Sequence, residues 1–279
     1  MLTIPQTLQA QAGLAAEKAE SLRAPIRFLV AGVLGGAYIG VGVVLMVSAA
    51  GPLAAADDGF AKLVAGVVFG VALTLVVFAG ADLATSAMMV LPQGVLMRSV
   101  GAGRALAVLL AMLAANLLGA ILFGALVVAS GVLRAGTDAG AMLASLLATK
   151  AAETPLELFS RGILCNALVC LAVWMGARVR SEGARIVLIF AAITAFVASG
   201  FEHVVANMAV YGIGLFAGDP NATAPLFAGN LLWVGLGNLV GGGLVVGAGY
   251  WALGGRPRFE PAIASAGPEL QGVAESGEL

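Results

Sequence analysis

Residues 199–208 read SGFEHVVANM and place a carboxylate beside the only histidine of the chain, inside a long apolar segment. Glu202 is the one full charge of that segment, and an ionisable group at membrane depth is costly enough to indicate a functional site. The alternative is that Glu202 and His203 form a hydrogen-bonded pair that only fixes helix packing. Gly200 before the pair and Asn207 after it predict a broken helix. Because exposed backbone persists in lipid only when protein encloses it or it lines a cavity, the stretch favours a pore or binding site.

The composition is that of an integral membrane protein. Of the 279 residues, 61% are hydrophobic and 10% are charged, whereas a soluble domain has about 25% charged residues. This composition makes the lipid bilayer the expected surroundings, and the net charge of -1 argues against nucleic acid as a partner. Cys165 and Cys170 lie on different faces of one expected helix, so we expect no disulfide between them. One histidine provides no ligand set for a metal, and we expect no cofactor.

Three regions follow from the distribution of apolar residues. Residues 1–27 carry apolar side chains at alternating spacings of four and three, which predicts an amphipathic helix on the cytoplasmic surface, ended by Pro25. Residues 28–253 hold six apolar stretches, each about long enough to cross a bilayer. The acidic, proline-marked tail 254–279 is expected to be disordered. The predicted fold class is therefore an all-α membrane protein with six transmembrane helices, the second and fifth of them broken.

The basic residues predict the orientation. Ten of the 14 lysines and arginines fall in the terminal segments and the even-numbered loops, and four fall in the odd-numbered loops. Since basic residues gather on the cytoplasmic side of a membrane, both termini are expected in the cytoplasm.

An internal repeat relates the two halves of the chain. GADL at 80–83 matches GFEH at 200–203, and NLLG at 116–119 matches NLVG at 238–241, at offsets of 120 and 122. Three spans in each half require the second half to be inverted, and such repeats meet at a midplane site where the N-termini of broken helices face an anion. The repeat therefore predicts that Thr85 lies near His203.

Three motifs resemble the signatures of the formate/nitrite transporter family. They are GADLATS at 80–86, GILCNALVCLAVW at 162–174 and SGFEHVVANM at 199–208, and the likeness runs from about residue 25 to 255. The resemblance implies an aquaporin-like subunit of the bacterial inner membrane, assembled as a homopentamer with one pore in each protomer. The motifs look closest to those of nitrite-type members.

The resemblance also implies roles for particular residues. His203 would be the central pore histidine, Thr85 the hydroxyl on the loop that breaks span two, and Lys150 the basic residue of the outer vestibule. Glu202 would orient or tune the histidine. The full expected set is His203, Thr85, Lys150, Asn166, Asn238 and Glu202 at the pore, with Phe69, Leu73, Leu83 and Phe196 at apolar constrictions. Without the resemblance, the apolar residues would be assigned to ordinary core packing.

The resemblance implies a channel or transporter for a small monovalent weak-acid anion, and the position of His203 suggests that it supplies a proton. Nitrite is the expected anion, and formate or hydrosulfide is the alternative within the family. A neutral-solute channel of aquaporin type should carry paired Asn-Pro-Ala motifs, which the sequence lacks. An enzyme is not expected, because no nucleophile has a base at usable spacing. A purely structural protein would not need Glu202 and His203 inside an apolar span.

Overall fold

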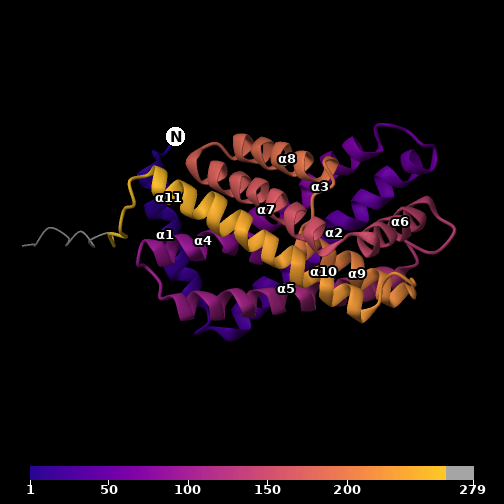
Figure 1. Cartoon of the computed structure of the whole chain (residues 1–279), viewed down its shortest axis with the longest axis horizontal. Helices are drawn as coiled ribbons and strands as arrows, with labels where there is room; N and C mark the ends of the chain where they lie inside the picture. The colour runs from indigo at the N-terminus through magenta and orange to yellow at the C-terminus, as the bar shows by residue number, and fades with distance from the viewer. Residues whose placement is uncertain (262–279) are drawn as a thin grey trace, which may run out of the picture.

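The computed structural model describes residues 1–261, and within this range every regular element is helical. The helices run roughly along one long axis (Figure 1), with α1 and α11 at one end and α6 toward the other. The elements are α1 (Ile4–Ser21), α2 (Pro25–Ala55), α3 (Ala61–Phe78), α4 (Ala84–Leu96), α5 (Ala102–Ser130), α6 (Asp138–Ala152), α7 (Pro155–Arg178), α8 (Glu182–Ala198), α9 (Val204–Ala217), α10 (Ala224–Leu239), the π-helical η1 (Val240–Ala248) and α11 (Gly249–Leu253).

Five helical stretches of the described chain are long and apolar enough to cross a membrane. They are α2, α3, α5, α7 and the continuous run from α10 to α11. The sequence led us to expect six crossings. The expected fifth crossing is divided into α8 and α9, of 17 and 14 residues, and neither is long enough alone.

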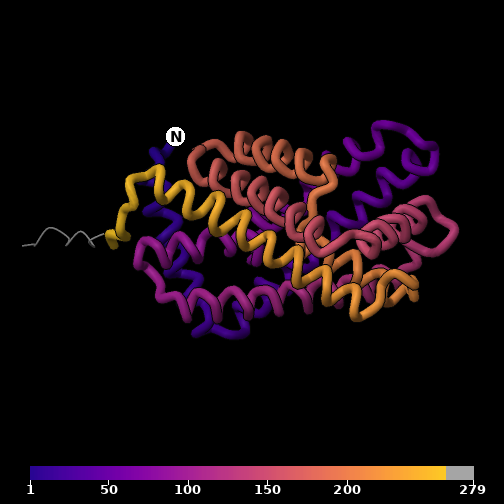
Figure 2. The backbone as a smooth tube through the Cα atoms, in the orientation of Figure 1, coloured from indigo at the N-terminus to yellow at the C-terminus, as the bar shows by residue number. Residues whose placement is uncertain are grey.

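Two short non-helical segments interrupt the bundle at the positions that the sequence indicated. One joins α3 to α4 over residues 79–83, and the other joins α8 to α9 over 199–203. The second can be followed in Figure 2, where the orange tube leaves the end of α8 and crosses to the start of α9. Gly80 and Gly200 have φ angles of 79° and 73°, which residues with a side chain rarely adopt. Each break therefore depends on a glycine at the same position of the repeat.

Glycines also let the long helices of each half approach closely. A Cβ at Gly119 of α5 would lie 1.9 Å from the carbonyl oxygen of Val33 in α2. A Cβ at Gly241 in η1 would lie 2.2 Å from the carbonyl oxygen of Ile163 in α7. Because Gly119 and Gly241 are equivalent in the repeat, the two halves use the same close helix contact.

The N-terminal helix differs in one respect from the sequence-based expectation. α1 ends at Ser21, and Pro25 begins α2 rather than ending α1. The reason is that proline has no backbone N–H and suits the first position of a helix. α1 buries Leu8 and Ala12 fully, and a Cβ at Gly94 of α4 would lie 2.4 Å from the Cβ of Ala15. The apolar face of α1 is thus packed against the protein itself.

The first part of the expected disordered tail is held in place. Gln9 of α1 donates from Nε2 to the carbonyl oxygen of Arg258 at 2.8 Å and accepts at Oε1 from the backbone N–H of Glu260 at 3.0 Å. The backbone N–H of Phe259 donates to the carbonyl oxygen of Met97 at 2.9 Å. Residues 258–260 are therefore held against α1 and the end of α4, whereas the rest of the expected tail, 262–279, lies outside the described residues.

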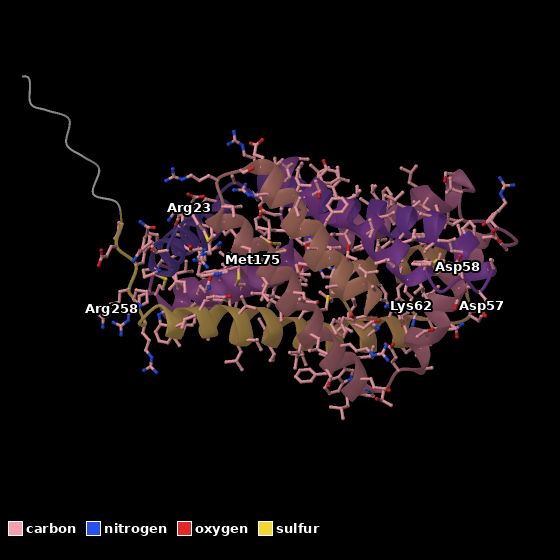
Figure 3. All side chains as sticks on the ribbon, turned by 90° about the horizontal axis from the view of Figure 1, so that it is seen from above. Arg23, Asp57, Asp58, Lys62, Met175 and Arg258 are labelled. Carbon is pink, nitrogen blue, oxygen red and sulfur yellow. The ribbon has the colours of Figure 1, made fainter. Side chains whose placement is uncertain are left out.

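Charged side chains mark the two ends of the bundle. Arg23 and Arg258 lie at one end in Figure 3, and Asp57, Asp58 and Lys62 lie at the other. The apolar flanks between these ends suit a protein with a polar region on each side of a lipid layer.

Candidate functional site

Four cavities lead toward the two helix breaks. A vestibule of about 830 Å³ lies beside the loop that joins α2 to α3, and it shares Lys150, Gly200 and Glu202 with a cavity of about 110 Å³. That cavity shares Phe69, Phe196 and His203 with a space of only about 10 Å³.

The fourth cavity lies beyond this smallest space. It measures about 260 Å³ and begins one helical turn further along α3, α7 and α8, where α1 also lines it. The four spaces outline a path through the bundle that is nearly closed at its centre.

Thr85 and His203 meet at that centre, as the repeat predicted. Oγ1 of Thr85 lies 3.0 Å from Nε2 of His203, and both residues are buried. Thr85 belongs to the first turn of α4, and His203 is the N-cap of α9. The N-termini of the two half-helices therefore converge on one point, where their dipoles favour an anion.

The hydrogen bonds of His203 assign its tautomer. Nδ1 accepts from the backbone N–H of Ala206 at 3.1 Å, so in the neutral ring the proton resides on Nε2. Nε2–H then donates to the hydroxyl oxygen of Thr85. Protonation at Nδ1 would break the bond to Ala206 and place a cation at a helix N-terminus, where it is unfavourable. The geometry therefore favours a neutral imidazole until negative charge arrives.

The four expected constriction residues surround the smallest cavity. Phe69, Leu73, Leu83 and Phe196 all line it together with His203. The rings of Phe69 and Phe196 meet edge to face with centroids 6.0 Å apart, and Phe196 stacks on His203 at 6.0 Å. A space of about 10 Å³ holds at most about one water molecule, so the path is shut here.

Lys150 lines the vestibule as expected, but its ion pair with Glu202 was not predicted. Nζ of Lys150 lies 2.6 Å from both carboxylate oxygens of Glu202, and Asn207 donates to the same carboxylate at 2.6 Å. Glu202 thus bonds Lys150 and Asn207, whereas the ring nitrogens of His203 bond Thr85 and Ala206. The side chains of Lys150 and Glu202 are only 10% and 6% exposed, so Lys150 is a buried partner of Glu202 rather than a free surface cation.

Asn166 and Asn238 are buried and bind backbone at the breaks, and neither lines the cavities of the path. Asn238 accepts at Oδ1 from the N–H of Val204 at 2.9 Å and donates from Nδ2 to the carbonyl oxygens of Glu202 and Gly162. Asn166 donates to the carbonyl oxygens of Thr85 and Asn238. Their side chains shape the site by holding the chain around it.

Asn116 does in the first half what Asn238 does in the second, and our sequence-based assignment omitted it. Its Oδ1 accepts from the N–H of Ala84 at 2.8 Å, and its Nδ2 donates to the carbonyl oxygens of Asp82 and Gly32. The signal was available, because Asn116 aligns with Asn238 in the repeat.

An ion pair between Lys18 of α1 and Asp82 of the first break was also missed. It mirrors the pair of Lys150 and Glu202, since Asp82 and Glu202 are equivalent in the repeat. Each break therefore has a carboxylate that binds a lysine from the helix at the start of its half.

These features define a membrane transport protein: apolar helices of spanning length, two helix breaks that meet at a histidine, and cavities on either side of a constriction. The family model described as "Formate/nitrite transporter" matches residues 5–252, and the chain belongs to this family. The resemblance of the three motifs is thereby confirmed.

Individual relatives agree with this assignment. The nitrite transporter NirC of Escherichia coli (strain K12) is 37% identical over 229 residues, covering 81% of this chain and 83% of NirC. A solved structure described as an FNT family ion channel has a TM-score of 0.83 at 35% identity, covering 88% of this chain and 98% of that one. A pentameric formate channel with formate bound has a TM-score of 0.72 at 28% identity, covering 83% and 98%.

Proposed function

We propose that the protein conducts a small monovalent weak-acid anion, nitrite before formate, and that His203 supplies a proton on the way. The observation that carries the proposal is the contact of His203 with Thr85 at the meeting point of two half-helix N-termini, directly beside the apolar constriction. Nitrite is preferred because NirC, a nitrite transporter, is 37% identical, while the formate channel structure supports formate as the alternative at 28%.

The mechanism follows from the cost of moving charge through the constriction. A bare anion loses its hydration between Phe69 and Phe196, which is costly unless it is neutralised. Among the described residues, no negative charge stabilises a protonated His203 in the resting site. An anion bound at the N-termini of α4 and α9 supplies that charge. His203 can then hold a second proton and pass one to the anion, so that the neutral acid crosses the apolar residues.

The proposed architecture is a six-span inverted repeat in the inner membrane, with both termini in the cytoplasm. The matching bonds of Asn116 and Asn238 to the two breaks support the repeat, since duplicated halves retain equivalent contacts. A homopentamer with one pore in each protomer is proposed by analogy with the pentameric formate channel.

Flux into proteoliposomes tests the function. We expect nitrite and formate to enter faster than glycerol, and to enter faster as the pH falls from about 8 to about 6, because protonation converts the anion into the neutral acid that crosses the apolar constriction. Hydrosulfide belongs in the same comparison as a third weak-acid anion. Glycerol flux that exceeds anion flux at every pH would support an aquaporin-like neutral-solute channel instead.

Cysteine labelling tests the orientation. Single cysteines at Asp57 and Asp219 should react with an impermeant reagent from outside, and one at Ser181 should not. The native Cys165 and Cys170 are buried, which keeps background labelling low. Reaction of the Ser181 variant from outside would reverse the proposed orientation.

A further inference from the structure

A second ion pair lies in the vestibule, outside the path residues described so far. Glu153 follows the last residue of α6, and Arg161 stands on the second turn of α7. Nη1 of Arg161 donates to Oε1 of Glu153, and both residues line the cavity of about 830 Å³. The side chain of Arg161 is 36% exposed and that of Glu153 is 5% exposed. The guanidinium therefore faces the cavity, and the carboxylate is buried beside it.

The surroundings of the Glu153 carboxylate are unfavourable for a charged group. Oε2 is buried, and no hydrogen-bond partner for it occurs in the part of the chain that the structure describes. Burial, followed by the nearby Glu202 carboxylate, raises the pKa of Glu153 above its ordinary value, although Lys150 and Arg161 oppose the change. A carboxyl of this kind takes up a proton at a higher pH than an exposed glutamate does.

The carboxylate of Glu153 also resembles the proposed substrates. Formate is itself a carboxylate, and nitrite is a bent anion with two terminal oxygens. The planar fork of a guanidinium binds such two-oxygen anions through parallel N–H donors. The guanidinium of Arg161 is therefore suited to bind an anion that reaches the vestibule, but the carboxylate of Glu153 is already bound to it.

We propose that Arg161 is an outer binding site for a two-oxygen monovalent anion, and that Glu153 is its built-in competitor. With Glu153 ionised, the carboxylate holds Arg161 and the site is blocked. With Glu153 protonated, the acid no longer competes as an anion, and the guanidinium is free to bind one from the cavity. The identity of the ligand rests on the proposed function, whereas the competition rests on the geometry of the pair.

Among the charged groups around Glu153, Arg161 is the one that protonation of Glu153 would free to bind an anion. Lys150 is bound by both oxygens of Glu202 at 2.6 Å, and Glu157 accepts from Thr154 at the start of α7. Tyr211 of α9 is the remaining titratable group near Glu153, and the vestibule rim carries Asp57, Asp58 and Lys62. Of the lysines and arginines that line the vestibule, Arg161 alone is held by Glu153, so it is the one that protonation of Glu153 releases.

Line broadening of ¹³C-formate by the purified full-length protein in detergent tests the proposal, since it detects weak binding without transport. Wild type should bind formate more tightly as the pH falls from about 8 to about 5, because Glu153 becomes protonated and no longer competes for Arg161. Glu153→Gln should bind about tenfold more tightly than wild type at the upper pH, with little further change at the lower one. Arg161→Gln should lose this binding at both.

The double variant Glu153→Gln/Arg161→Gln serves as the control for folding, because two amides can retain a hydrogen bond across the same gap. It should elute and melt like wild type yet bind like Arg161→Gln. Equal formate binding by wild type and Glu153→Gln at the upper pH, or full binding by Arg161→Gln, would overturn the proposal. Failure of the proposed function has a different signature, namely pH-dependent binding by wild type in vesicles that pass neither nitrite nor formate.

Discussion

His203→Asn is expected to abolish the pH dependence of nitrite flux and to lower its rate by about a hundredfold, the usual scale of a lost proton transfer. Asparagine cannot titrate, so the anion would have to cross the constriction with its charge. The substitution should leave the fold intact, because asparagine is a favourable N-cap and its Oδ1 can accept from the N–H of Ala206 as Nδ1 now does. The measurement is nitrite flux into proteoliposomes between about pH 5 and about pH 8.

Two substitutions at Thr85 provide the matched control. Thr85→Ser keeps the hydroxyl that lies 3.0 Å from Nε2 of His203, and Thr85→Val keeps the shape without it. If the hydroxyl orients the imidazole for proton transfer, only the valine variant should reduce flux, and its residual flux should keep the pH dependence. If instead His203→Asn transports nitrite at the wild-type rate with the wild-type pH profile, the histidine has a packing role only.

The positions of the helix breaks could be predicted from the sequence because their signals are local. A glycine two residues before a charged residue within an apolar run is a pattern that neither a continuous helix nor a loop explains. The contact of Thr85 with His203 spans 118 residues, yet the repeat predicted it. Equivalent segments of duplicated halves meet around a common axis, so an offset in sequence becomes a position in space.

The partners of the charged residues could not be predicted in the same way. Lys150 and Glu202 are 52 residues apart, and their ion pair exists because α6 folds back beside the second break. The spacing of residues in the sequence does not show that α6 lies there. We therefore expected Glu202 to act on its neighbour in the chain, His203. Both side chains line the cavity of about 110 Å³, yet Glu202 binds Lys150 and the ring of His203 binds Thr85.

The asparagines illustrate the same limit. Asn166 and Asn238 were expected among the pore residues because the resemblance to the formate/nitrite transporter family implies pore asparagines at these positions. A helix break creates another need, since its backbone N–H and C=O groups are buried without helical partners. Asn238 and Asn116 bind those backbone groups. The groups need such partners only because the folded protein encloses the breaks.

Asn238→Leu is therefore expected to be the most destabilising substitution at the second break. The change keeps the side-chain volume but leaves two buried backbone groups at the break unpaired, the N–H of Val204 and the carbonyl oxygen of Glu202. It also removes a further bond to the carbonyl oxygen of Gly162, which lies inside α7. At about 1 to 3 kcal/mol for each unpaired group, the loss should be about 3 kcal/mol or more. Thermal unfolding of the purified protein in detergent measures it as a lower melting temperature.

Asn116→Leu and Asn230→Leu show whether the backbone contacts are the cause. Asn116 makes the same three bonds at the first break, so its substitution should destabilise the protein to a similar extent. Asn230 is equally buried but accepts one bond, from the side chain of Asn207 at 2.7 Å, and its loss should cost about 1 kcal/mol. Equal melting temperatures for Asn238→Leu and Asn230→Leu would mean that the breaks keep their shape without the asparagine bonds. In that case packing of α4 and α9 against the long helices would have to hold Thr85 beside His203.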